Sequence, residues 1–345
     1  MTSRLSRIEV YKTVDKELPS YDYTKLSNYN VCPVWGIVRY FHHKRMPGAG
    51  RAMALEAGGV AHQCFAAVRI YQLYHHQHRH ELAIRQLEAC YGPSRAEHLR
   101  AYLVERDAQV FTLEVLYTAG YYDDPNDRRR TLANLEDLAI GYVARWDFNR
   151  YPVYVSDALV GVECSFDLTL NFIRDDGDSK RVRFTGRIDG IHVDPQNQNR
   201  VMIQENKTTW RIDDSWRMSY AISHQVTGYM TAARYLTGED VSTGFVVGTA
   251  VPLPKQAANG FAWEYVTREP YQTKNWFDWF YHTVTQSDQY VSDHLSAPQY
   301  SHSCNRFFRP CSLIPLCASD HDEQQRILTE MEHDEWSPLE DPEAS

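Results

Sequence analysis

The chain has 345 residues, of which 43% are hydrophobic, so it can bury a core as one large domain or two small ones. Its seven cysteines are an odd number, which argues against a disulfide framework, and no apolar run approaches the roughly 20 residues that cross a bilayer. The net charge of −9 disfavours contact with nucleic acid, but residues 321–345 carry −8 of it and the preceding 320 residues only −1, which leaves room for a local basic groove.

The first 150 residues are predicted to form a polar segment followed by a helical lobe. Residues 1–30 are polar and rich in tyrosine, with weak structure, and the N-terminus lacks the apolar stretch of a signal peptide, so we expect a cytoplasmic protein. In the lobe, apolar residues recur at helical spacing, and breaks fall at Gly92-Pro93 and at residues 123–126. The expected helices are 52–77, 81–91, 94–119 and 127–148.

Residues 151–300 are predicted to form an α/β core, because segments rich in β-branched and aromatic residues alternate there with helical ones. The expected strands are 160–172, 181–193, 201–208, 241–251 and 261–266. The expected helices are 214–236 and 275–291. A cysteine-rich segment, 301–320, follows, and the acidic residues 321–345 are interpreted as a solvated mobile tail.

The strongest chemical signal lies on two neighbouring predicted strands. One carries Asp189, the next carries Glu205 and Lys207, and a turn over residues 194–199 joins them. Glu205 and Lys207 are two residues apart, so their side chains leave the same face of a strand. Two clustered carboxylates favour a divalent cation such as Mg²⁺, and a lysine beside it can polarise a water for attack on phosphorus.

The alternative for these three residues is a surface hairpin with ordinary charges, since strand edges often carry lysine and glutamate. Against it, the apolar run Val201-Met202-Ile203 leads into a buried strand that ends at Glu205 and Lys207. Charged groups at such a position cost free energy unless they are paired or bound to a metal.

Three further side chains are candidates for the same site. Gln225 and Tyr229 are four apart on one helix face, where they can hydrogen-bond a DNA phosphate or simply pack. His62 follows Gly58-Gly59 early in a helix. A core or surface histidine is the alternative, but the paired glycines permit close backbone approach, and an imidazole ligand suits Mn²⁺ better than Mg²⁺.

Four cysteines lie near the two ends of the chain, at Cys32, Cys304, Cys311 and Cys317. Four thiolates can hold zinc or an iron–sulfur cluster, and the three closing residues are spaced too loosely for a zinc ribbon. A metal bound by all four would tie the ends of the chain together and contribute directly to folding. The alternative is a set of unrelated buried cysteines.

Together these segments resemble the PD-(D/E)XK nuclease superfamily in its RecB-like branch with an iron–sulfur cluster, which includes AddB-like, CRISPR-associated and phage exonuclease relatives. The match runs in consistent order from about residue 22 to residue 318. The matching segments are Leu26-Ser27-x3-Val31-Cys32-Pro33, Gly59-x2-His62, Gly186-Arg187-Ile188-Asp189, Glu205-Asn206-Lys207, Gln225-x3-Tyr229 and the three closing cysteines.

The resemblance implies a restriction-endonuclease-like core, a central mixed sheet flanked by helices, with the helical lobe before it and an iron–sulfur segment after it. It implies catalytic roles for Asp189, Glu205 and Lys207 and DNA contacts for Gln225 and Tyr229. The implied metal-binding positions are His62, Asp189, Glu205 and Asn206. The implied ligands of a 4Fe–4S cluster are Cys32, Cys304, Cys311 and Cys317, with zinc as the lesser alternative, although their spacing is wider than the common pattern. Glu163 resembles an acidic position upstream of Gly186.

We therefore expect a Mg²⁺- or Mn²⁺-dependent exonuclease that hydrolyses DNA ends or single strands in recombination, repair or phage DNA metabolism. DNA and a helicase or recombination protein are the expected partners. The chain lacks a GxxxxGK[ST] phosphate loop, so we expect it to carry no motor of its own. The alternatives are an endonuclease of the same fold and a non-catalytic iron–sulfur module that binds DNA. Trp35, Tyr40 and Phe41 are candidates for stacking on bases.

Overall fold

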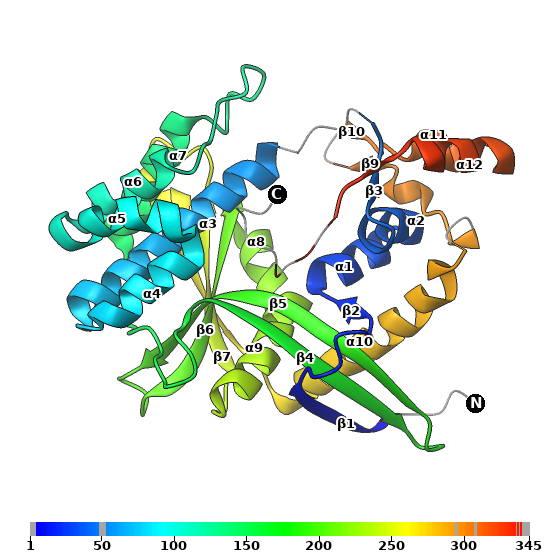
Figure 1. Cartoon of the computed structure of the whole chain (residues 1–345), viewed down its shortest axis with the longest axis horizontal. Helices are drawn as coiled ribbons and strands as arrows, with labels where there is room; N and C mark the ends of the chain where they lie inside the picture. The colour runs from blue at the N-terminus through cyan, green and yellow to red at the C-terminus, as the bar shows by residue number, and fades with distance from the viewer. Residues whose placement is uncertain are drawn as a thin grey trace. The chain divides into compact units, whose positions relative to one another are not determined.

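A computed structural model describes residues 5–47, 53–293, 296–306, 309–335, 337 and 339. It has a mixed sheet flanked by helices (Figure 1). The strand order is β1-β4-β5-β6-β7-β8, with β2 beside β5. β6 and β7 are parallel, whereas β1–β4, β5–β6 and β7–β8 are antiparallel. The predicted α/β class with a central mixed sheet is thereby confirmed. The predictions for residues 1–4 and 340–345 lie outside the described residues.

The strands of the main sheet include the two that were expected to carry the site, β5 and β6. They are β1 (Leu5–Lys12), β2 (Ser20–Tyr21), β4 (Val162–Arg174), β5 (Ser179–Asp194), β6 (Arg200–Thr209), β7 (Thr243–Ala250) and β8 (Phe261–Thr267). Two small ribbons pair β3 (Lys44–Arg45) with β11 (Glu332–His333), and β9 (Asn305–Arg306) with β10 (Arg309–Pro310).

The helices fall where apolar spacing predicted most of them. They are α1 (Tyr23–Val31), α2 (Pro33–Gly36), α3 (Met53–Tyr71), α4 (His80–Tyr91), α5 (Pro93–Glu105), α6 (Ala108–Tyr117), α7 (Leu132–Arg145), α8 (Asp214–Met218), α9 (His224–Thr237), α10 (Pro270–Val291), α11 (Ile314–Ala318) and α12 (His321–Glu330). Within 1–30, β1 and α1 replace the expected weakly structured segment.

Local capping explains where the predicted helices break. The expected helix 94–119 is α5 and α6, because the Asp107 carboxylate accepts the Val110 N–H at 2.9 Å and starts a new helix. The expected helix 214–236 is α8 and α9, separated by a 3₁₀ turn, with Ser223 as the N-cap of α9. The expected helix 127–148 starts only at α7, capped by Thr131.

The chain folds as two compact units whose boundaries differ from the predicted ranges 1–150, 151–300, 301–320 and 321–345. Unit 1 comprises residues 1–50, 167–186 and 274–339. Unit 2 comprises residues 51–166, 187–273 and 340–345. β4 and β5 each contribute residues to both units, which is why sequence ranges did not separate them. Among the described residues, none of the helices is long and apolar enough to cross a bilayer.

In unit 2, helices cover both faces of the β6–β7 pair. On one face, Met202 and Phe245 join a buried cluster with Phe65 of α3 and Tyr142 of α7. On the other face, α9 comes so close that a Cβ added to Gly244 would lie 3.2 Å from Met230 Cε of this helix. Helix α3 also packs on β6, so residues of α3 and β6 can meet in one site (Figure 1).

In unit 1, the acidic C-terminal region is partly a packed helix. Ile327 and Leu328 of α12 and the following Met331 are buried in a cluster with Ile37 and Leu316. Residues 321–330 are therefore not a mobile tail, and this part of the interpretation was wrong. The acidic side chains of α12 lie on its exposed face, which allows the helix to be both charged and packed.

Two of the three aromatic residues proposed to stack on bases have packing roles in unit 1. The ring of Phe41 lies 5.9 Å from that of Tyr21, edge to face, and the Lys25 ammonium lies 5.1 Å from the Phe41 ring centroid. Trp35 lies in the wall of a cavity that the four predicted cluster cysteines also line. Of the three candidates, Tyr40 is partly exposed, with the Arg39 guanidinium 5.4 Å from its ring centroid, and its proposed stacking on bases stays a prediction.

Candidate functional site

Two buried carboxylates lie where β5 and β6 part. The strands pair from Asp194↔Arg200 to Gly190↔Gln204, and Asp189 and Glu205 come directly after that last pair. The backbone N–H of Asn206 donates to Asp189 Oδ2 at 2.5 Å, which fixes the carboxylate at the end of the ladder. The expectation that adjacent strands bring Asp189 toward Glu205 and Lys207 agrees with this arrangement.

Glu205 and Lys207 form an ion pair on one face of β6. Lys207 Nζ lies 2.7 Å from Glu205 Oε1, and the exposed fraction of the side chain is 31% for the lysine but only 3% for the glutamate. Burial raises the pKa of Glu205 despite the opposing effect of Lys207, and Asp189 raises it further. Burial alone would lower the pKa of Lys207, but Glu205 outweighs it and raises that pKa.

His62 reaches the carboxylates from α3. Its Nδ1 lies 3.3 Å from Asp189 Oδ1, and its ring is about one-third exposed. Burial opposes protonation of His62, but Asp189 outweighs burial and raises the pKa of the imidazole. In return, His62 and Arg69 overcome the effect of burial on Asp189 and hold the pKa of this carboxyl well below its ordinary value. A Cβ added to Gly59 would meet no described atom within 4 Å, so protein packing does not require that glycine.

Glu163 and Arg69 extend the site. Arg69 is fully buried, and its Nη2 lies 3.0 Å from Glu163 Oε1. Burial and the neighbouring Asp189 raise the pKa of Glu163, while Arg69 and His62 oppose this rise. Glu163 has a backbone φ of +47°, a left-handed conformation that costs a non-glycine residue free energy and is often found at functional sites.

Sequence reasoning missed Arg69. It lies seven residues after His62 on the same helix, so both side chains leave nearly the same face, and it is a charge within the apolar run from Phe65 to Ile70. An arginine at such a position must have a buried counter-charge. The counter-charge, Glu163, is 94 residues away, which is why no short pattern revealed the pair.

The side chain of Asn206 lies away from Glu205 and Lys207. Its Oδ1 accepts hydrogen bonds from Tyr142 Oη at 3.0 Å and from Gln204 Nε2 at 2.8 Å. Gln204 and Asn206 share the face of β6 that α7 covers, opposite the face of Glu205. The structure thus brings Asp189, Glu205, Lys207 and His62 together but places the Asn206 side chain in a separate polar network.

Gln225 and Tyr229 form a pair on α9, as their spacing predicted. Gln225 Nε2 donates to Tyr229 Oη at 3.2 Å, and the Tyr229 ring meets Phe166 edge to face at 5.9 Å between centroids. Helix α9 packs on β6, the strand of Glu205 and Lys207. Gln225 and Tyr229 are therefore a partly buried polar pair in unit 2, which also contains the carboxylates.

The donor set of this site fits a divalent cation. Within the described ranges, no three His, Cys, Asp or Glu side chains already stand as a preformed group of metal ligands. However, Glu205 Oε2 is buried without a hydrogen-bond partner, although a buried carboxylate oxygen normally has one. A cation held by Asp189, Glu205 and His62 would satisfy this oxygen and relieve the repulsion between the two carboxylates.

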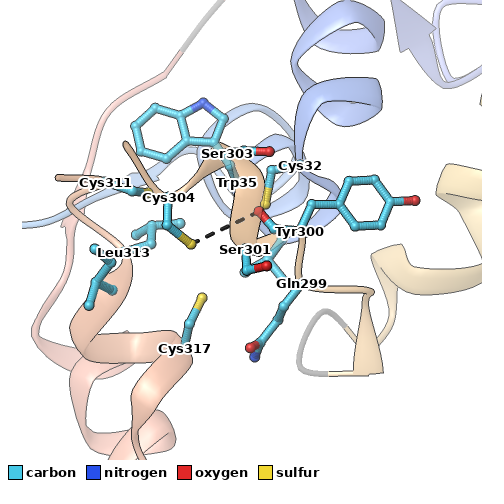
Figure 2. Close-up of a pocket in the computed structure, with 12 residues that line it drawn as sticks. Cys32, Trp35, Gln299, Tyr300, Ser301, Ser303, Cys304, Cys311, Leu313 and Cys317 are labelled. Carbon is cyan, nitrogen blue, oxygen red and sulfur yellow. Dashed lines mark hydrogen bonds between the residues drawn. The ribbon is translucent and has the colours of Figure 1, made fainter. Parts of the chain in front are cut away.

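The four predicted cluster cysteines line one cavity of about 140 Å³ in unit 1 (Figure 2). The sulfur atoms of Cys304 and Cys317 point into the same space (Figure 2). Cys304 and Cys311 flank the β9–β10 ribbon, and the Cys311 N–H donates to the Cys304 carbonyl at 2.7 Å. None of these four cysteines forms a disulfide bond, and Trp35, Leu313 and Ile314 are among the apolar walls of the cavity.

The thiols act on one another electrostatically. Burial raises the pKa of Cys317 to about 11, and the other three thiols add to the rise. The chain also ties the two ends of unit 1 together beside the cavity, because Ser303 Oγ donates to the carbonyl of Val31 at 2.6 Å. Four thiols around one cavity are the donor set of a 4Fe–4S cluster or a zinc ion.

No protein-family model matches this chain, and no curated protein matches it.

Proposed function

We propose that the chain is a metal-dependent DNA nuclease of the PD-(D/E)XK type, with a restriction-endonuclease-like core. One observation carries the proposal. Two buried carboxylates, Asp189 and Glu205, lie at the parting of two strands, with Lys207 ion-paired to one of them and His62 to the other. The protein leaves one oxygen of this carboxylate pair, Glu205 Oε2, without a hydrogen-bond partner. Such a pair beside a partly exposed lysine suits the binding of a cation that acts on a phosphodiester.

Asp189, Glu205 and His62 would hold the Mg²⁺ or Mn²⁺ ion. When bound, such an ion lowers the pKa of a coordinated water and neutralises charge on the phosphate. Lys207 remains charged at neutral pH, since Glu205 raises its pKa. Its ammonium can therefore orient the attacking water and stabilise the negative charge that grows on the phosphate oxygens. Arg69 and Glu163 form an ion pair that supports the carboxylates. Both side chains are less exposed to solvent than that of Lys207.

The test compares wild type with Lys207→Ala and Glu205→Gln on end-labelled single-stranded DNA in Mg²⁺ and in Mn²⁺. Each substitution should reduce the cleavage rate by roughly 10²-fold or more, the loss expected when a charged group that stabilises the transition state is removed. Lys255→Ala, an exposed lysine of the same unit, is the control and should cleave normally. Undiminished cleavage by Lys207→Ala would reject the catalytic assignment.

A circular single strand then separates the modes of action. We expect an exonuclease, which leaves the circle intact while it degrades the linear strand of the same sequence. Opening of the circle at a similar rate would assign an endonuclease. Binding of both forms without any cleavage, by wild type in either metal, would favour the non-catalytic DNA-binding module.

We further propose that Cys32, Cys304, Cys311 and Cys317 hold a 4Fe–4S cluster in unit 1. Their arrangement around one cavity supports this. Protein purified without oxygen should be brown and contain iron and sulfide. Cys311→Ser should lose the iron, whereas Cys90→Ser, which changes a cysteine of unit 2, should retain it. Stoichiometric zinc without iron would overturn the cluster and leave the nuclease proposal unaffected.

A further inference from the structure

An exposed apolar segment begins three residues after Lys207. Trp210, Met218 and Ile222 lie within thirteen residues of one another and are 67%, 70% and 78% exposed. Three large apolar side chains exposed within one short segment make that segment a candidate binding surface. We call residues 210–222 the apolar shelf.

The shelf is rigidly supported. The Asp213 carboxylate accepts the Trp216 N–H at 2.9 Å and caps α8. The ring of Trp216 covers Gly248, where an added Cβ would lie 2.4 Å from the indole, and it meets the ring of Tyr220 at 4.8 Å between centroids. Gly248 is the β7 partner of Lys207, so the shelf is anchored on the strand position beside the lysine.

A buried arginine fixes the other end of the shelf. Arg268 donates from Nη2 to the Tyr220 carbonyl at 2.8 Å and from Nε to Thr227 Oγ1 at 2.7 Å. Its side chain is almost fully buried, so these bonds tie the shelf to the start of α9. These contacts hold the segment from Asp213 to Tyr220 in place, and Trp210 precedes that segment by three residues.

The chemistry of the shelf fits nucleobases. The guanidinium of Arg211 lies 4.8 Å from the Trp210 ring centroid, and such an aromatic–arginine surface stacks on bases whatever their sequence. The charges of Arg211 and Arg217 are already paired with Asp213 and Glu264. The contribution of the shelf should therefore come from stacking more than from attraction to phosphate.

The distance between Trp210 and a phosphate bound at Lys207 determines which bases of the DNA the shelf can reach. Three residues of extended chain span at most about 10 Å, so Trp210 lies within a few nucleotides of a phosphate at Lys207. Only unpaired bases expose the faces that stacking requires. We propose that the apolar shelf stacks the unpaired bases of the strand whose phosphate lies at Lys207, which makes single-stranded DNA or a frayed end the substrate. This inference rests on the proposed nuclease function.

The test measures binding separately from cleavage. Fluorescence anisotropy of an end-labelled single strand in EDTA, which prevents cleavage, gives the Kd of wild type, Trp210→Ala and Trp210→Phe. Trp210→Ala should raise the Kd roughly tenfold, as expected for the loss of one stacked base, and Trp210→Phe should restore most of the affinity. The rise should persist at high salt. Tyr235→Ala, which removes an exposed ring near the C-terminal end of α9, should bind as wild type does.

Two other ligands sharpen the test. A strand of the same length with abasic sugars, and a blunt duplex, should bind wild type and Trp210→Ala equally. An unchanged Kd of Trp210→Ala for the single strand, or an equal loss on the abasic strand, overturns the inference. So does a Trp210→Ala effect confined to self-association or to lipid vesicles. If Lys207→Ala abolishes cleavage while Trp210→Ala binds normally, only this inference fails. If no DNA is cleaved but stacking persists, only the nuclease proposal fails.

Discussion

The carboxylate site of unit 2 and the thiol cavity of unit 1 differ in how much of their geometry the protein supplies by itself. Asp189 receives a backbone N–H and an imidazole, and Glu205 receives a lysine, all from regular strands and a long helix. The thiols are carried by short segments around a cavity. We infer that the first site is preorganised before its ion binds, whereas the second depends on its ligand for order.

Charge explains the difference. A buried carboxylate cannot be left alone, so the fold must surround it with donors and cations whether or not a metal is present. A buried thiol can simply stay protonated, as the raised pKa of Cys317, about 11, indicates. A metal bound by these thiols would release their protons, and its binding would couple directly to folding.

Removal of the proposed metal groups should give the largest effect. When the proposed iron–sulfur cluster is stripped from unit 1, hydrogen exchange should accelerate in α1, α2, α11 and α12, because these helices contribute the buried apolar side chains beside the cavity. EDTA, which removes only divalent ions, should leave the exchange of α3 and β6 in unit 2 nearly unchanged. Equal protection of unit 1 with and without its cluster, measured by mass spectrometry, would contradict the idea that the thiol site needs its ligand.

Arg69→Met should cost about 3–5 kcal/mol in the free energy of unfolding, because it leaves Glu163 buried without its counter-charge. Urea denaturation at pH 7.5 measures the loss. The double variant Arg69→Met/Glu163→Gln should recover much of it, since the unpaired charge is then gone. Arg217→Met, which breaks a partly exposed pair with Glu264, should cost no more than about 1 kcal/mol.

If the double variant is no more stable than Arg69→Met alone, the arginine contributes by packing and not by compensating charge. In that case the carboxylate site would be less preorganised than its ion pairs indicate, and the contrast with the thiol cavity would weaken.

Glu205→Gln should stabilise the metal-free protein by about 1–3 kcal/mol near pH 8 while it abolishes cleavage. Burial raises the pKa of Glu205, so its ionised form is costly in the folded state, and a neutral amide avoids that cost. Thermal unfolding with and without Mn²⁺ provides the check. Mn²⁺ should raise the melting temperature of wild type and not of the variant. A variant less stable than metal-free wild type would show that Lys207 compensates Glu205 fully.

The sequence predicts the central part of the candidate site because strand periodicity acts over short distances. Glu205 and Lys207 share a face by their spacing alone, and a hairpin turn brings Asp189 beside them. The same alternation puts Asn206 on the opposite face, where Tyr142 and Gln204 hold its side chain. The motif resemblance that named Asn206 as a metal position does not distinguish its side chain from its backbone.

Residues that depend on long-range packing are not accessible in this way. The buried charge of Arg69 is explained only by its ion pair with Glu163, which lies 94 residues away in the sequence. The acidic composition of residues 321–345 suggested a mobile tail, but Ile327, Leu328 and Met331 fall on one face of α12 and reach a core formed by distant helices. The composition of such a helix is dominated by the charged residues of its exposed face. The few apolar residues that determine its packing contribute little to that composition.

The smallest predicted effect concerns an ion pair of unit 1 that has no role in chemistry. Asp167 Oδ2 lies 2.7 Å from Arg183 Nη2 and 2.5 Å from Lys16 Nζ. Burial opposes ionisation of Asp167, but the hydrogen bonds from Arg183 and Lys16 outweigh it and lower its pKa to about 2. In the unfolded chain an aspartate titrates near pH 4. The carboxylate therefore stabilises the fold fully above about pH 4, and this contribution disappears as the pH falls from about 4 to about 2.

Asp167→Asn should accordingly destabilise the protein by about 1–2 kcal/mol at pH 7, less than the pKa shift alone implies, because the Lys16 side chain is 62% exposed and water screens its charge. Urea denaturation at pH 7, 4, 3 and 2 should show wild type and variant converging as the pH falls. Glu163 and Glu205 of unit 2 predict the opposite trend, since their raised pKa makes ionisation costly as the pH rises. A gap between wild type and Asp167→Asn that stays constant down to pH 2 would mean that the carboxylate charge does not stabilise unit 1, and the contrast in sign with Glu163 and Glu205 would be lost.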